Sequence, residues 1–267
     1  MLYLFIFLSG LVFGSFLNVV ILRLPLGQNI AYPGSHCPKC GQKLRWWHNI
    51  PLLSWLLLGG KCANCKAPIS IQYPLVELGT GLLFVGIFFL HPDIYGLITA
   101  IVFSLLLALS LIDLRYKAVP DSLNLTAAFL AIFSSPNILA NLENGLLVAG
   151  ALAMLRFLVS YYVSKKEQMR LQKRIKKAPW LIHFYPRFVM IEAMGEGDII
   201  VGFAMGALLG LQKSLVAIFL AALFALPASI YMRWRKGEAE LPFIPFLVLG
   251  MLVAYIIGDR IWEMVGV

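Results

Sequence analysis

Long apolar runs are the feature that most constrains the fold of this chain, because a helix that crosses the hydrocarbon core of a bilayer needs about 20 apolar residues. Hydrophobic residues make up 60% of the 267 residues and charged residues 13%, about half the share typical of soluble chains. This composition excludes a disordered chain, a fibrous repeat and a secreted disulfide scaffold. We predict an all-α polytopic membrane protein with about eight transmembrane helices, at residues 2–22, 75–90, 95–114, 122–139, 145–163, 198–211, 214–232 and 244–262.

The distribution of basic residues predicts the orientation. No basic residue precedes the first run or lies within it, and Arg23 follows it, so we read it as an uncleaved span with the N-terminus outside. The loops that then face the cytoplasm hold nineteen of the 22 Lys and Arg, against two outside, Lys213 and Arg260; Arg156, in the fifth run, can snorkel to the inner surface. This positive-inside pattern explains the net charge of +9 without any nucleic acid partner.

The runs predict three parts: a first transmembrane helix (1–22), a cytoplasmic zinc-binding domain (23–74) and a membrane domain (75–267) with a basic cytoplasmic loop at about 164–197. Within that loop, residues 165–177 contain seven Lys or Arg. This segment is either a site for anionic lipid or a solvated amphipathic segment. The sequence does not decide between the two.

All four cysteines lie in the first cytoplasmic loop, as two Cys-x-x-Cys pairs separated by 21 residues. Two such pairs supply four thiolates to a tetrahedral zinc ion, the closed form typical of structural sites. Disulfides or free thiols are the alternatives, and a reducing cytoplasm disfavours the disulfides. His36 and His48 flank the pairs and are expected at the surface. The predicted ligands are Cys37, Cys40, Cys62 and Cys65.

Carboxylates inside apolar runs are costly and mark candidate functional sites. Asp113 ends one run and Asp198 opens another, after Gly195-Glu196-Gly197. Two carboxylates at one depth can share a proton and activate water, as in aspartic proteases. Alternatively, Asp113 pairs with a nearby basic residue and Asp198 favours a helix N-terminus. Asp121 is expected to be an N-cap, and Glu77 is a lesser candidate.

Together the motifs resemble the type IV prepilin peptidases in their bifunctional form, over nearly the whole chain. The segments that carry the resemblance are residues 14–21, 23–25, 33–40, 46–55, 62–65, 68–70, 73–77, 113–121, 195–198, 242–243 and 245–247. The resemblance implies a bacterial cytoplasmic-membrane protease of the Gly-x-Gly-Asp type, with Asp113 and Asp198 catalytic. Its substrates would be prepilins and pseudopilins of type IV pilus and type II secretion systems. The resemblance also implies N-methylation of the exposed amino group, with S-adenosylmethionine as donor.

The chain departs from the family pattern at Ile200, where the family often has lysine, and at Ile244, where it often has glycine. These departures concern substrate positioning and the polarity around Asp198. No Gly-x-Gly-x-x-Gly follows a strand, so the usual nucleotide-binding context is missing. The sequence does not identify the donor site, and Glu77, Asn18 and the cysteine loop are only guesses for it.

For the peptidase reaction, we assign Asp198 as the base and Asp113 as the acid, because they occupy the N-terminal and C-terminal ends of their helices, respectively. Three other readings stay open: a peptidase without methyltransferase activity, an ion-coupled transporter, and a membrane scaffold that presents a zinc module. The sequence does not indicate an oligomeric state.

Overall fold

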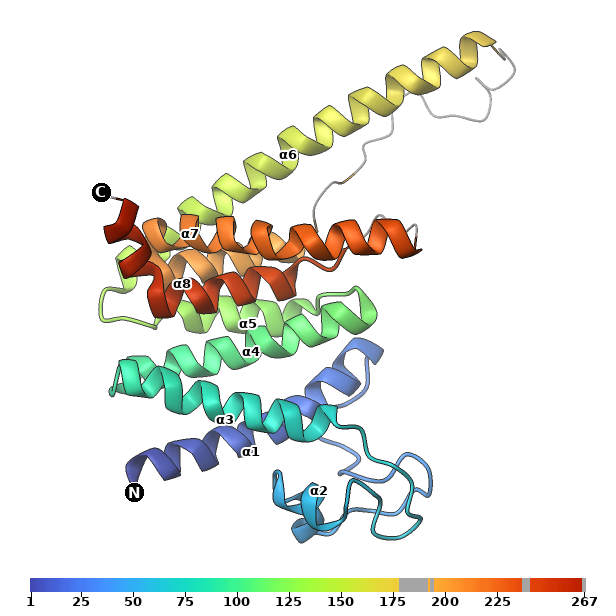
Figure 1. The fold of residues 1–267 in the computed structure, drawn as a ribbon, viewed down its shortest axis with the longest axis vertical. Helices are drawn as coiled ribbons and strands as arrows, with labels where there is room; N and C mark the ends of the chain where they lie inside the picture. Colours follow the sequence, from blue (N-terminus) through green and yellow to red (C-terminus); the bar gives the residue numbers. More distant parts are fainter. Residues whose placement is uncertain (178–191, 193–194, 237–240, 266–267) are drawn as a thin grey trace.

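The chain forms a bundle of long helices (Figure 1). A computed structural model describes residues 1–177, 192, 195–236 and 241–265. Within these residues the only strand-like pairings are two isolated bridges, so the all-α prediction is confirmed. The helices are α1 (Leu2–Arg23), α2 (Leu53–Leu57), α3 (Gln72–Leu90), α4 (Ile94–Tyr116), α5 (Asp121–Ile132), α6 (Ile138–Lys177), α7 (Glu196–Lys236) and α8 (Ile244–Val265), with 3-10 turns η1 (Leu24–Leu26) and η2 (Trp46–Asn49).

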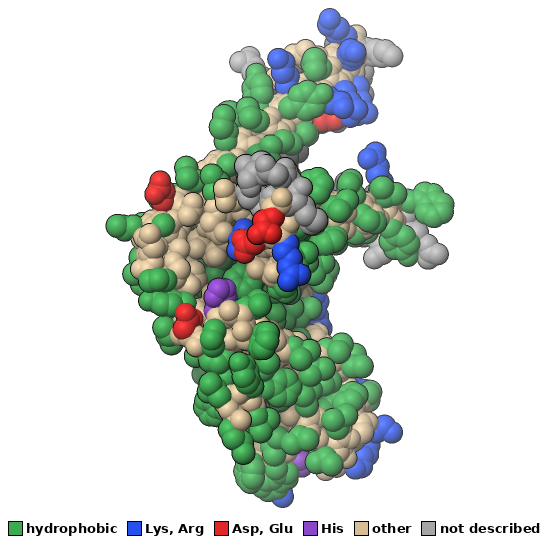
Figure 2. All heavy atoms as spheres, turned by 60° about the vertical axis from the view of Figure 1, so that its left-hand side comes forward, with side chains coloured by type: hydrophobic (Ala, Val, Ile, Leu, Met, Phe, Trp, Pro, Cys, Tyr) green, Lys and Arg blue, Asp and Glu red, His purple; other side chains and the backbone are tan. Residues whose placement is uncertain are grey.

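Six of the described helices are long and apolar enough to cross a membrane: α1, α3, α4, α6, α7 and α8. Hydrophobic side chains cover much of the flank of the bundle (Figure 2), as expected for a surface that faces lipid. The count differs from the eight predicted runs for two reasons. One predicted run falls largely on α5, which has only 12 residues, and two others lie within α7.

The long α7 is two helices joined at one residue. Gly210 has a non-helical backbone, with φ 74° and ψ 172°, a conformation that glycine adopts without steric penalty. The Ser214 hydroxyl lies 3.4 Å from the Met205 carbonyl oxygen, whereas nine residues of straight helix span about 13.5 Å. The chain therefore folds back on itself at Gly210, and the predicted runs 198–211 and 214–232 become an antiparallel pair.

Two boundaries differ from the prediction around α5 and α6. The predicted run 122–139 is interrupted after Ile132, where Ser134, Ser135 and Pro136 separate the helices and the Asn137 side chain accepts a hydrogen bond from the Ala140 N–H at 3.3 Å. At its other end α6 continues helically to Lys177, so the first part of the predicted loop 164–197 is helix. Residues 178–191 of that loop lie outside the described residues.

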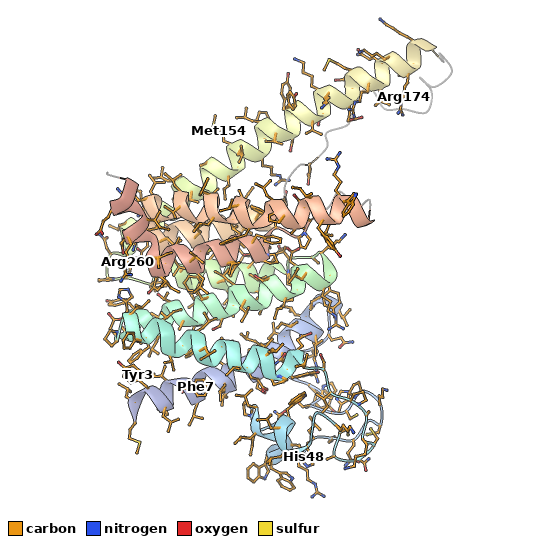
Figure 3. The ribbon with its side chains drawn as sticks, in the orientation of Figure 1. Tyr3, Phe7, His48, Met154, Arg174 and Arg260 are labelled. Carbon is orange, nitrogen blue, oxygen red and sulfur yellow. The ribbon has the colours of Figure 1, made fainter. Side chains whose placement is uncertain are left out.

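This extension of α6 projects beyond the bundle and carries basic side chains, including Arg174 (Figure 3). Arg260 lies at the opposite end of the helices, and His48 lies on the cysteine-bearing segment (Figure 3). Near Arg260, Lys213 pairs with Asp259 at 2.8 Å. Lys213 and Arg260, the two basic residues predicted outside, thus lie within α7 and α8, at the end of the bundle away from the cysteines.

Close helix packing depends on glycine at a few positions. A Cβ on Gly14 of α1 would lie 2.0 Å from Thr80 Oγ1 and 2.8 Å from Glu77 Cα of α3. Likewise, a Cβ on Gly206 of α7 would lie 2.4 Å from the Asn144 carbonyl oxygen of α6. Small residues of this kind let helix backbones approach in membrane proteins. The central helix α4 buries Phe103, Leu106, Leu109 and Ile112 completely or nearly so.

Candidate functional site

Asp113 lies in the last turn of α4 and is buried, with 7% of its surface exposed. Its Oδ2 accepts a hydrogen bond from the Ile244 backbone N–H, 3.3 Å away, at the first residue of α8. The neighbouring Arg115 guanidinium lies over the ring of Tyr116, 5.4 Å from its centroid. The first residue of α8 therefore holds the Asp113 carboxyl, although the two residues are 131 positions apart in sequence.

Asp198 lies in the first turn of α7 and is 9% exposed. The turn before it is packed against the connection between α4 and α5. The Asn124 side-chain amide donates to the Gly197 carbonyl oxygen at 3.0 Å, and a Cβ on Gly197 would meet the Val119 side chain at 2.9 Å. These contacts bring the beginning of α7 to the same end of the bundle as the end of α4.

The two aspartates lie at the same end of the bundle, where the beginning of α7 packs against the connection between α4 and α5. They come from a helix end and a helix beginning that are 85 positions apart in sequence. Two buried carboxyls that lie close together can hold a shared proton and polarise a water molecule. Asp121 is not the N-cap that we expected: it is the first residue of α5 and exposed, and Pro120 occupies the cap position without a side-chain hydrogen bond.

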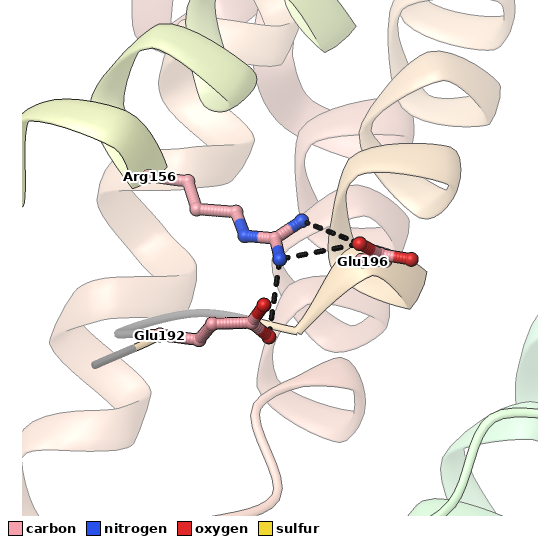
Figure 4. Close-up of polar contacts among 3 residues, drawn as sticks. All are labelled: Arg156, Glu192 and Glu196. Carbon is pink, nitrogen blue, oxygen red and sulfur yellow. Dashed lines mark hydrogen bonds and ion pairs between the residues drawn. The ribbon is translucent and has the colours of Figure 1, made fainter. Parts of the chain in front are cut away.

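An ion-pair cluster that sequence reasoning missed holds the turn before Asp198 (Figure 4). Arg156 of α6, with 17% of its side chain exposed, lies 3.3 Å from Glu196 and 3.2 Å from Glu192. Both terminal nitrogens of Arg156 donate to the same Glu196 oxygen. The only signal in the sequence was an arginine inside an apolar run, and its partners are 36 and 40 positions away.

The four cysteines converge on one point. Their sulfur atoms all lie within 4.8 Å of one another, with Cys37 and Cys62 buried and the other two exposed. Cys37 Sγ and Cys65 Sγ are 3.8 Å apart, which matches the edge of about 3.8 Å expected for a tetrahedron with Zn–S bonds of about 2.3 Å. The residues present therefore fit a tetrahedral metal ion.

Each cysteine pair lies on a tight turn of the same kind. The Cys37 N–H donates to the Gln42 carbonyl at 3.0 Å, and the Cys62 N–H donates to the Ala67 carbonyl at 2.8 Å. Neither flanking histidine belongs to the sulfur cluster. His36 Nδ1 lies 3.0 Å from the Gly34 carbonyl oxygen, and the His48 ring packs edge-on against Trp47.

Backbone N–H groups favour ionised sulfur in the first pair. The backbone N–H of Cys40 is the largest of the influences that lower the pKa of the Cys37 thiol, and the backbone N–H of Gln42 lowers that of Cys40. The Ala67 N–H acts in the same direction on Cys65, but burial and the neighbouring thiols raise the pKa of Cys65 to about 11. Four thiolates so close together repel one another, and a bound cation would offset that repulsion.

Glu77 of α3 lies outside the aspartate pair and is buried, with 7% exposed. Its Oε2 accepts a hydrogen bond from the backbone N–H of Leu52, 2.8 Å away. Leu52 belongs to the segment between the two cysteine pairs. The cysteine-bearing segment thus contacts the membrane helices through a buried carboxylate.

Comparisons with known proteins agree with the resemblance seen in the sequence. Residues 8–91 match the family model described as bacterial peptidase A24 N-terminal domain, and residues 100–230 match that of the type IV leader peptidase family. The predicted division at residue 74 stays a prediction. No solved structure gives a significant match.

Similar proteins carry the name prepilin leader peptidase/N-methyltransferase. The protein of Myxococcus xanthus is 36% identical over 236 residues, which are 88% of this chain and 64% of the relative. The protein of Stutzerimonas stutzeri is 34% identical over 94% of this chain and 89% of its own length. The protein of Neisseria gonorrhoeae is 32% identical over 96% of this chain and 91% of its own length.

Proposed function

The chain belongs to the type IV leader peptidase family, and from this premise we propose that it cuts the leader from prepilins and pseudopilins and then methylates the exposed amino group. One observation carries the peptidase half of the proposal. The carboxyls of Asp113 and Asp198 are buried at two helix ends, and the contacts of Gly197 with Asn124 and Val119 hold those ends at the same end of the bundle.

In the proposed reaction a water molecule between the two carboxyls attacks the carbonyl carbon of the scissile bond. Asp198, at the N-terminal end of α7, is stabilised as a carboxylate by the helix dipole and takes a proton from the water. Asp113, at the C-terminal end of α4, is the protonated partner and donates to the carbonyl oxygen. The Ile244 N–H fixes the Asp113 carboxyl from α8, which supports a defined geometry for this step.

The turn before Asp198 is suited to a peptide substrate. Gly195 is exposed and carries no side chain, and the contacts of Gly197 with Asn124 and of Glu196 with Arg156 hold this turn in place. A peptide chain that lies along such a turn can bring its carbonyl to the carboxyls without a clash of side chains. Positioning of this kind accounts for much of the rate in an enzyme without a covalent intermediate.

We assign a zinc ion to the sulfur atoms of Cys37, Cys40, Cys62 and Cys65. Four thiolates fill the tetrahedron, so this ion would be structural and would not activate water. The S-adenosylmethionine expected from the resemblance would supply the methyl group. The positive-inside pattern supports a cytoplasmic location for the cysteine segment and the aspartates, with the N-terminus outside the bacterial inner membrane.

Mass spectrometry of a co-expressed prepilin tests the proposal. Wild-type enzyme should give a product that lacks the leader and carries one added methyl group. Asp113→Asn and Asp198→Asn should leave the precursor whole, with at least a ~10³-fold loss of rate. Asp259→Asn, next to Arg260 at the other end of the bundle, should cut normally. Cleavage at the wild-type rate by either aspartate variant would refute the mechanism. A wild-type product that is cleaved but not methylated would show that the protein is a peptidase without methyltransferase activity.

A further inference from the structure

The segment between the two cysteine pairs, residues 41–61, exposes large apolar side chains in the part of the chain that the structure describes. Trp46 of η2 is 76% exposed, and Leu56 and Leu57 of α2 are 64% and 85% exposed. The segment belongs to none of the six helices that are long and apolar enough to cross a membrane. Apolar side chains gathered at the surface in this way mark a contact with lipid or protein.

Helix α2 has one apolar face and another side that is fixed to the chain. Leu53, Leu56 and Leu57 share the apolar face, because residues three and four positions apart lie on the same side of a helix. Trp55 lies on another side of α2, and its Nε1 donates to the Ile69 carbonyl at 3.3 Å. Trp55 thus holds α2 against the residues that lead into α3, and the three leucines are left exposed.

The 3-10 turn η2 adds aromatic and basic groups next to α2. The rings of Trp46 and Trp47 pack edge to face, with centroids 5.4 Å apart, and the Arg45 guanidinium lies 5.1 Å from the Trp47 ring centroid. His48, the third residue of η2, lies near α2 on the outer side of the bundle (Figure 3). Tryptophan is enriched at the level of the lipid headgroups, where arginine binds phosphate. The turn η2 therefore has the composition of a segment at the membrane surface.

A hydrogen bond places the start of α2 alongside a helix that can cross the membrane. The Leu52 N–H donates to Glu77 Oε2 at 2.8 Å. Glu77 lies five residues after Gln72, the first residue of α3, which is about 7.5 Å along the helix. All 19 residues of α3 are needed for a hydrocarbon core of about 30 Å, because they span about 28 Å. Figure 1 accordingly shows α2 beside the beginning of α3, and not beyond the end of the bundle.

Helix α1 gives an independent measure of this depth. Gly14 is level with Glu77, since a Cβ on Gly14 would lie 2.8 Å from Glu77 Cα. Arg23, the first charged side chain of the sequence, comes nine residues after Gly14, about 13.5 Å along α1. At the level of Gly14, Phe16 of α1 and Leu75 of α3 are 47% and 58% exposed, as expected for side chains that face lipid. The start of α2 therefore lies on the lipid side of the level that Arg23 marks.

We propose that η2 and α2 form an interfacial membrane anchor, and that the lipid of one leaflet covers its apolar face. Leu53, Leu56 and Leu57 enter the headgroup end of the acyl-chain region, and Trp46 and Arg45 lie at the headgroups. Segments with this division between apolar and polar groups lie in the plane of the interface, with the apolar face about 5–10 Å deep. The anchor holds the cysteine pairs against the membrane surface, and it requires neither of the two proposed activities.

Tryptophan fluorescence in lipid nanodiscs tests this contact. Full-length, zinc-loaded protein is placed in phosphatidylcholine with or without bromine on the acyl chains, because bromine quenches only tryptophan that lies close to it. Leu57→Trp adds a tryptophan on the leucine face, and Lys39→Trp, at an exposed position between Cys37 and Cys40, is the matched control. After subtraction of the wild-type signal, brominated chains should quench the tryptophan of Leu57→Trp about twofold or more. Aqueous iodide should instead quench that of Lys39→Trp.

A second measurement adds no tryptophan and uses hydrogen exchange in the same nanodiscs. Leu53→Ser with Leu57→Ser removes two exposed leucines, so the cysteine pairs should keep their zinc, as measured by elemental analysis. A helix of five residues is not stable in water by itself, and a cover of lipid slows the exchange of its amides. Exchange in α2 should therefore become about tenfold faster in the double variant than in wild type, whereas exchange at residues 37–42 should not change.

Three results would overturn the proposal. Equal quenching of both added tryptophans by iodide would place the leucine face in water. Quenching of Leu57→Trp by neither agent, with a signal that changes as the protein is diluted in lipid, would show that a second copy covers the face. Unchanged exchange in α2 of the double variant would show that the leucines do not contact lipid.

Discussion

Gly197→Ala should disable the peptidase by moving the turn that carries Asp198. The added Cβ would lie 2.9 Å from each of three Val119 atoms, its Cβ and both Cγ atoms. Carbon atoms pack at about 3.5–4.0 Å, so each contact is short by about 0.6 Å or more. Because β-branched valine is stiff at χ1, the turn has to move, at a cost of about 1–3 kcal/mol.

The same movement lowers the rate of cleavage. Gly197 directly precedes Asp198 and is held by Asn124 at 3.0 Å, so a shift of the turn displaces the carboxyl from its partner. A displacement approaching 1 Å costs up to about 100-fold in rate. We therefore expect the kcat for leader cleavage to fall by about 10- to 100-fold, as measured by mass spectrometry of a prepilin peptide over time.

A second substitution makes this reasoning refutable. Val119→Ala removes two of the three short contacts, so the Gly197→Ala, Val119→Ala pair should recover at least half of the lost activation free energy. Gly150→Ala is the matched control, because a Cβ on Gly150 would have no atom within 4 Å. Wild-type cleavage by Gly197→Ala, or a double variant no faster than the single one, would show that the steric argument is wrong.

Three further predictions concern contacts outside the aspartates. In a double-mutant cycle of cleavage rates, Arg156→Gln and Glu196→Gln should couple by about 1 kcal/mol, because their ion pair is partly exposed; additive effects would contradict a role for this pair at the turn. Cys37→Ser with Cys40→Ser should remove the bound zinc, measured by elemental analysis, and make residues 23–74 sensitive to protease; unchanged zinc content would exclude the four-sulfur site. Gly14→Ala should lower the thermal midpoint by several degrees, since its Cβ would lie 2.0 Å from Thr80 Oγ1, and an unchanged midpoint would show that α1 and α3 can separate without cost.

Features encoded by neighbouring residues were predictable from the sequence. The apolar runs predicted the helices, and the two Cys-x-x-Cys pairs predicted a cluster that the structure closes to within 4.8 Å. The errors arose where hydropathy outweighed local chemistry. Ser134, Ser135 and Pro136 were a signal to end α5, and the absence of Gly and Pro from residues 151–177 was a signal to continue α6.

Long-range contacts were beyond prediction from one sequence. The Leu52–Glu77 hydrogen bond joins residues 25 positions apart, and Arg156 meets Glu196 across 40 positions. Neither pair has a periodicity or a motif, because the fold creates them by bringing separate helices together. For the same reason Asn18 was only one polar residue in an apolar run until the structure placed its amide against Tyr73.

The reversal at Gly210 also has a consequence for how the protein is made. Because no loop separates the two halves of α7, we expect them to enter the bilayer together during synthesis. They would insert as a single hairpin with Lys213 near its tip. Biogenesis of the segment that follows Asp198 therefore depends on a turn at the far end of the bundle from the aspartates.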